Sequence, residues 1–92
     1  MIRSFRHKGL QTFFVSGRVT GIRPEQADRI PLILGRLAVA EEARDMALPR
    51  LRLHSLKGRL KGYSAMNVSG NWRIVFRFAG KDVIDVDYLD YH

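Results

Sequence analysis

The sequence predicts an α+β fold in which two N-terminal helices pack on a small antiparallel sheet. Apolar residues recur at a helical period up to about residue 40 and alternate with a period of two after Pro49. The chain has 92 residues, 46% hydrophobic and 27% charged, a globular composition that leaves no room for a second core. Residues 1–92 are therefore expected to form a single domain.

The N-terminal region is expected to contain a short strand and then a helix. Residues 2–6 alternate imperfectly and predict the strand. Leu10, Phe13 and Phe14 then share one helical face. Gly17 is the expected C-cap, because glycine readily adopts the left-handed conformation that ends many helices.

A second helix is predicted from Pro24, because proline suits the first turn of a helix. Its apolar stripe consists of Ala27, Ile30, Leu34 and Leu37. Pro31 interrupts this stripe, since it has no N–H to donate and clashes with the preceding turn. We expect a kink or a break there, followed by a polar connection at residues 41–45.

The C-terminal half predicts a meander of strands. Alternation indicates strands at residues 51–56, 63–68, 72–78 and 83–88. Ser69-Gly70-Asn71 is predicted to be a tight hairpin turn, and Gly80-Lys81-Asp82 the next turn. In the last strand, Ile84, Val86 and Tyr88 are expected to share a face.

The positive charge is concentrated in one segment. The net charge is +7, and residues 46–81 contain eight Lys or Arg residues and no Asp or Glu. Such a surface predicts a polyanionic partner, because neutralising phosphates releases condensed counterions. Nucleic acid is favoured over an anionic membrane, since the cations interleave with strand patterns rather than an amphipathic helix. The alternative is a solvated basic face without a ligand.

Several function classes are excluded or disfavoured by what is missing. The chain has no cysteine, and its three histidines lack metal-ligand spacing, so no metal site is expected. It has neither a Gly-rich phosphate loop nor a GxSxG nucleophile motif. No apolar run is long enough to span a bilayer, and the N-terminus lacks a signal-peptide pattern, so a cytoplasmic protein is expected.

What remains for chemistry is a cationic, metal-free set of side chains. Its members are His54, Lys57, Arg73, Asp90, Tyr91 and His92. Cleavage within RNA suits such a set, because the ribose 2′-OH of the substrate is the nucleophile and the protein supplies proton transfer and charge stabilisation. The alternative is structural: Arg73 and Arg77 could pair with Asp85 and Asp87 across the sheet, and the C-terminus could be frayed.

Three segments resemble the HigB-type toxins of the RelE/ParE superfamily, in the pattern of its plasmid maintenance system killer proteins. They are residues 4–14, 51–78 and 86–92, and their most specific motifs are LxxLKG, VSGNWRIVFRF and the terminal DYH. The resemblance covers almost the whole chain and is weakest between Arg18 and Met46. Pro31 departs from it, because the family more usually has an uninterrupted helix there.

The resemblance implies a RelE-like microbial ribonuclease fold and an activity. Toxins of this kind cleave mRNA in the A site of the translating 70S ribosome without a metal or cofactor, and a helix-turn-helix antitoxin of the HigA type holds them inactive. By resemblance, His92 acts in general acid–base catalysis, assisted by His54 and Lys57. Arg73 would stabilise the scissile phosphate. Which residue is the acid and which the base stays open.

The remaining roles also follow from the resemblance. Tyr91 would orient the mRNA nucleotide, and Asp90 and Asn71 would orient other groups. The cations expected to bind RNA and ribosomal RNA through backbone charge, with Asn71, are Arg50, Arg52, Arg59, Lys61 and Arg77. Two alternatives remain: a non-enzymatic ParE-like toxin that binds DNA gyrase, and a basic RNA-binding module without catalysis.

Overall fold

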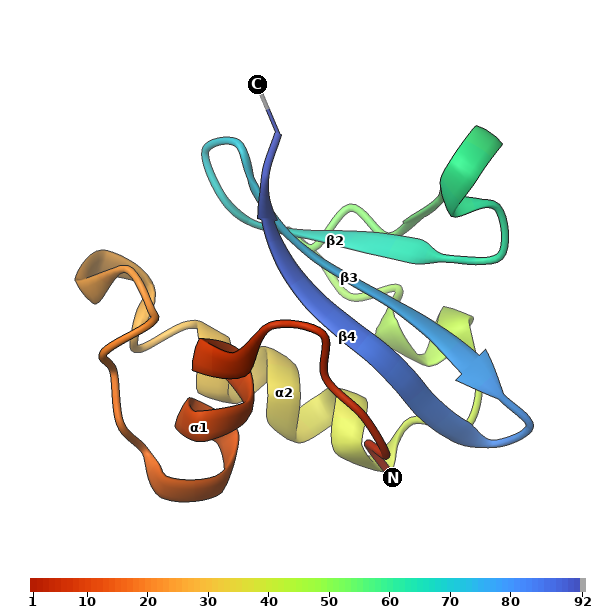
Figure 1. Ribbon diagram of the computed structural model, residues 1–92. Coiled ribbons are helices and arrows are strands. Elements are labelled where there is room, and N and C mark those ends of the chain that lie inside the picture. Colours follow the sequence, from red (N-terminus) through yellow and green to blue (C-terminus); the bar gives the residue numbers. More distant parts are fainter. Residues whose placement is uncertain (92) are drawn as a thin grey trace.

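Four antiparallel strands form a sheet in which neighbours along the chain are also neighbours in space. In the computed structural model, which describes residues 1–91, they follow the order β1-β2-β3-β4: β1 (His54–Ser55), β2 (Ser64–Ser69), β3 (Trp72–Ala79) and β4 (Asp82–Asp90). Helices α1 (Lys8–Ser16) and α2 (Ile30–Val39) lie together on one side of this sheet (Figure 1). The predicted α+β arrangement is confirmed. The 3₁₀ turns are η1 (Pro24–Gln26), η2 (Ala43–Met46) and η3 (Gly58–Leu60).

The core lies between the helices and the sheet. Helix α2 contributes Ile30, Ile33, Leu34 and Leu37, and the sheet contributes one face of β2, β3 and β4. The principal core residues are Leu10, Ile30, Ile33, Leu34, Leu37, Met46, Met66, Val68, Ile74, Phe76, Val83, Val86 and Tyr88. Burial of this continuous apolar surface is the main force that holds the helices on the sheet.

Helix α1 is capped at both ends, and its C-cap is the predicted one. His7 caps it, because its Nδ1 accepts a hydrogen bond of 2.9 Å from the backbone N–H of Leu10. Gly17 closes it with a left-handed φ of +77°, and its N–H donates to the carbonyl of Phe13. Leu10 is fully buried, whereas Phe14 is 41% exposed, so the predicted apolar face is only partly covered.

The predicted second helix is divided into two elements. The residues after Pro24 form only η1, and α2 starts at Ile30 with Pro31 in its first turn. This is the position where a missing N–H has no consequence, because the first helical N–H groups have no partner inside the helix. The expected break is therefore confirmed, and it separates η1 from α2. None of the helices among residues 1–91 is both long and apolar enough to cross a membrane.

The N-terminal segment runs beside β4 without becoming a strand. Ile2 and Phe5 form isolated parallel bridges with Val83 and Val86. The strand predicted for residues 2–6 is wrong in extent, since only these two positions pair. The segment nevertheless covers the outer edge of β4, as Figure 1 shows.

The strand predicted for residues 51–56 is mostly absent. Arg50 and Arg52 adopt left-handed φ values of +74° and +50°, and only His54 and Ser55 join the sheet as β1. Between the two arginines, the side chain of Leu51 is buried and its carbonyl accepts from the N–H of Asn67. In a regular strand both arginines would have extended φ values and lie on the face opposite Leu51. Their left-handed φ values are incompatible with a pleated strand, so the strand does not form here.

A bulge in β4 changes which side chains face the core. Between the pairs Val75–Asp87 and Arg77–Ile84, two residues of β4 oppose one residue of β3. One of the two, Asp85, has a φ of +55°. Val83 and Val86, three residues apart, are consequently both buried, so the predicted shared face is wrong for Ile84.

Candidate active site

The turn between β2 and β3 lies beside the C-terminal end of β4. Gly70 takes a left-handed φ of +54° at the first central position of the turn, which favours glycine. Ser69 pairs with Trp72, so Gly70 and Asn71 form a two-residue loop. Beyond the last residue of β4, the N–H of Tyr91 donates to the carbonyl of Asn71 at 2.8 Å. The structure therefore brings Asn71 and Tyr91 together, although they are far apart in the sequence.

Arg73 is half-buried and directed toward this turn. Its Nη1 donates to the carbonyl of Gly70 at 2.9 Å and to the carbonyl of Trp72 at 3.1 Å. No carboxylate within residues 1–91 forms an ion pair with it. Two backbone contacts thus fix one nitrogen of a guanidinium that no carboxylate of the described residues neutralises, an arrangement suited to binding an anion.

His54 and Arg73 lie on the same face of the sheet, the one opposite the core. His54 pairs with Ala65, which pairs with Val75, and Arg73 is two residues before Val75 on β3. Paired residues and residues i and i+2 share a face. The spacing between strands and along them places the two Cα atoms about 12 Å apart. Side chains of this length can approach opposite sides of one phosphodiester across that span.

The ring of His54 is oriented by its backbone neighbour. Its Nδ1 lies 2.8 Å from the carbonyl oxygen of Arg52. A carbonyl only accepts hydrogen bonds, so Nδ1 carries the proton in the neutral ring and Nε2 carries the lone pair. The left-handed backbone of Arg52 is part of this local geometry.

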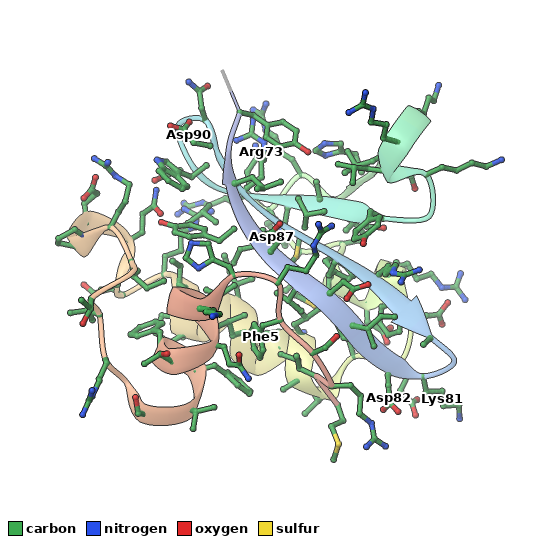
Figure 2. All side chains as sticks on the ribbon, viewed as in Figure 1. Phe5, Arg73, Lys81, Asp82, Asp87 and Asp90 are labelled. Atoms are coloured by element: carbon green, nitrogen blue, oxygen red, sulfur yellow. The ribbon has the colours of Figure 1, made fainter. Side chains whose placement is uncertain are left out.

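The C-terminal residues divide between the two faces. Asp90 pairs with Trp72, on the face that bears the helices, whereas Leu89 pairs with Arg73 on the other. Figure 2 shows Asp90 and Arg73 at the same end of the sheet, with Asp87 nearer its middle. The predicted catalytic residue His92 lies outside the described residues.

Most of the cations expected to bind RNA have no acidic partner. Within residues 1–91, six of the eight Lys and Arg residues of the 46–81 segment form no ion pair: Arg50, Arg52, Lys57, Arg59, Lys61 and Arg73. Lys57, Arg59 and Lys61 come from η3 and its flanks, beside the β1–β2 edge of the sheet (Figure 1). This surface of uncompensated charge is suited to a polyanion.

Arg77 differs from the other predicted RNA-binding cations. It forms an ion pair of 2.8 Å with Asp85, and its guanidinium lies over the ring of Tyr63. Hydrogen bonding to Asp85 raises the pKa of Arg77 above its ordinary value. The alternative of cross-strand pairing therefore holds for Arg77. It does not hold for Asp87, whose carboxylate accepts from the N–H of Tyr88.

Sequence reasoning missed a set of contacts behind the turn. Gln26 is 2% exposed; its Nε2 donates to the hydroxyl of Ser69 at 2.7 Å, and its Oε1 accepts from the hydroxyl of Tyr88. These partners are 43 and 62 residues away, so no local pattern identifies them.

Among the described residues, no three His, Asp or Glu side chains are grouped so that they could hold a metal ion.

Comparison with known proteins gives two matches over nearly the whole chain. A family model described as the RelE-like toxin of the type II toxin–antitoxin system HigB matches residues 3–92. The protein named Endoribonuclease HigB from Proteus vulgaris is 39% identical over 92 residues, which is 100% of each chain.

Proposed function

This chain belongs to the HigB-like family of RelE-like toxins from type II toxin–antitoxin systems, as its resemblance predicted. From this membership we propose that the protein is a ribosome-dependent mRNA endonuclease that cleaves in the A site. The observation that carries the proposal is the placement of His54 and Arg73 on one face of the sheet. The relative named as an endoribonuclease supports RNA as the substrate.

The proposed reaction uses the ribose 2′-OH as the nucleophile and needs no metal. A base removes the 2′-OH proton, a bond forms between O2′ and phosphorus, and the bond from phosphorus to O5′ breaks. An acid delivers a proton to O5′, which leaves a 2′,3′-cyclic phosphate and a 5′-hydroxyl. The protein must therefore supply a base, an acid and a cation for the phosphate oxygens.

His54 is the proposed base. The carbonyl of Arg52 accepts from Nδ1, which leaves the lone pair of the neutral ring on Nε2. Arg73 is the proposed phosphate ligand, since its guanidinium can contact two oxygens at once. Lys57 adds a second cation near the edge strand.

The other proposed roles lie at the turn and the C-terminus. Tyr91 stacks on or orients the nucleotide, supported by its hydrogen bond to Asn71. Asp90 and Asn71 orient neighbouring groups. The resemblance gives His92 a part in general acid–base catalysis, and with His54 as the base we assign it the acid step.

Docking on the ribosome is proposed to use the unpaired cations. Arg50, Arg52, Arg59 and Lys61 would bind ribosomal RNA by backbone charge, without reading sequence. Arg77 is proposed as a weaker contributor, because Asp85 already compensates its charge. Membership of a type II toxin family implies an antitoxin partner, and a HigA-like helix-turn-helix protein is the proposed one. The cytoplasm is the proposed compartment, since ribosomes and mRNA are there.

The alternative functions make different demands on the site. A gyrase-binding toxin does not need His54 and Arg73 on one face, and a passive RNA-binding module does not need an oriented imidazole. The match to a HigB family over residues 3–92 also favours the nuclease.

A ribosome assay tests the proposal. Purified protein is mixed with 70S ribosomes programmed with a defined mRNA, and new 5′ ends are mapped. Ends within the A-site codon are expected for the wild type, and His54→Ala and Arg73→Ala should lower cleavage at least 100-fold while leaving antitoxin binding intact. Equal cleavage of free RNA would contradict ribosome dependence, and DNA breaks in cells without mRNA cleavage would favour gyrase.

A further inference from the structure

The buried Gln26 amide connects two parts of the candidate site. Gln26 lies at the end of η1, outside the sheet, and binds Ser69 at the end of β2 and Tyr88 near the end of β4. Ser69 immediately precedes the Gly70–Asn71 turn, and Tyr88 is two residues before Asp90. One side chain therefore joins the segment that carries Asn71 and Arg73 to the segment that carries Asp90 and Tyr91.

The register of β2 explains how Ser69 reaches the helical side. Asn67 shares the face of its partner Arg73, and in a regular strand Ser69 would lie on that face too. The pairing shifts between Asn67 and Ser69, so that Ser69 pairs with Trp72 instead. This irregularity turns the hydroxyl of Ser69 toward Gln26, beneath the turn.

Aromatic packing reinforces the same connection. The rings of Trp72 and Tyr88 are stacked with centroids 4.6 Å apart, and the guanidinium of Arg23 lies 5.8 Å from the Trp72 ring centroid. Trp72 is flanked by Asn71 and Arg73, and its carbonyl accepts from Arg73. The backbone that presents Arg73 is thus held by groups on the opposite face of the sheet.

We propose that Gln26 is a positioning residue, which fixes the β2–β3 turn against the end of β4 and so holds Arg73, Asn71 and Tyr91 in their catalytic arrangement. The proposal rests on the proposed nuclease function for the meaning of that arrangement. Without the amide, Ser69 can bind water instead, and the turn loses its side-chain link to Tyr88 on β4. Gln26 contacts neither RNA nor the reacting atoms in this assignment.

Gln26→Leu removes both hydrogen bonds at similar volume. We expect kcat for cleavage of ribosome-bound mRNA to fall at least tenfold, while KM changes less than threefold. We also expect the Tyr91 amide, which donates to Asn71, to exchange its hydrogen at least fivefold faster. The matched control is Gln11→Leu, an exposed glutamine on α1, which should leave both quantities unchanged.

A double variant separates positioning from stability. Gln26→Leu removes the side-chain acceptor of the buried Tyr88 hydroxyl, and Gln26→Leu/Tyr88→Phe removes that hydroxyl, so the melting temperature should recover. The loss of kcat and the fast exchange of the Tyr91 amide should persist, because Ser69 still lacks its hydrogen bond from residue 26. Ser69→Ala, an exposed and milder change, should produce the same two effects.

Recovery of kcat together with the melting temperature would overturn the proposal, and so would unchanged Tyr91 exchange in both Gln26→Leu and Ser69→Ala. If the wild type cleaves no mRNA, the nuclease function fails, and the exchange measurement alone decides whether Gln26 holds the turn.

Discussion

Arg77 on β3 binds Asp85 at the bulge of β4, with Nε and Nη2 both 2.8 Å from the same carboxylate oxygen. Asp85 has a left-handed φ of +55°, and its N–H donates to the hydroxyl of Ser4 in the N-terminal segment. An ion pair, a left-handed backbone conformation and a hydrogen bond to the N-terminal segment therefore all occur at the bulge.

Two substitutions of Asp85 should distinguish the contribution of its left-handed backbone conformation to stability from the contribution of its ion pair. Asp85→Ala is expected to lower the free energy of unfolding by about 1–2 kcal/mol, because alanine tolerates left-handed φ poorly. Asp85→Asn should lower it by less, since asparagine adopts this conformation and an ion pair this exposed to solvent contributes little. Urea unfolding measures both. Equal losses would show that the backbone conformation is not the main contribution.

Two glycines with open space around them should respond in opposite directions. A Cβ added at either Gly70 or Gly35 meets no atom within 4 Å, so only the backbone decides the outcome. Gly70→Ala should lower the free energy of unfolding by about 1 kcal/mol, because Gly70 has a left-handed φ. Gly35→Ala, within α2, should raise it by about 0.5–1 kcal/mol. Shifts of the same sign in urea unfolding would contradict this.

Ribosome binding should depend on salt through the unpaired cations. Arg59→Ala is expected to reduce the slope of log K against log salt by about 0.7–0.9, the value for one lost phosphate contact. Arg77→Ala should change it less, because Asp85 compensates that charge. Arg36→Ala is the matched control, an exposed arginine on the helical side. A titration from low to high salt measures all three, and equal slopes for every variant would contradict docking by the basic segment.

Alkaline pH should weaken the fold through Tyr88. Burial raises the pKa of the Tyr88 hydroxyl above its ordinary value of 10.0. The unfolded chain therefore loses this proton before the folded chain does, so the contribution of Tyr88 is present below pH 10 and is lost as the pH rises through the folded value. The difference in free energy of unfolding between the wild type and Tyr88→Phe should shrink from pH 8 to pH 11. A constant difference in urea unfolding would contradict this.

Local patterns were sufficient where the structure depends on neighbouring residues. The cap at Gly17, the turn at Gly70 and the strand of alternating residues after it follow from local conformational preference and periodicity. The patterns failed at residues 51–56 and at Ile84, where left-handed residues interrupt the alternation. These left-handed residues are Arg50, Arg52 and Asp85 rather than glycine, so their residue type did not predict the conformation.

The sequence by itself determined the α+β class, the family and the concentration of positive charge in residues 46–81, and it predicted the residues of the candidate site. The tertiary structure decided the spatial arrangement: which face carries His54 and Arg73, which described cations form no ion pair, and how Gln26 joins Ser69 to Tyr88. The physical reason is range. Periodicity and helix caps depend on residues close together in the sequence. Strand register, ion pairs and buried hydrogen bonds join residues that are far apart in the sequence, and only folding brings those residues together.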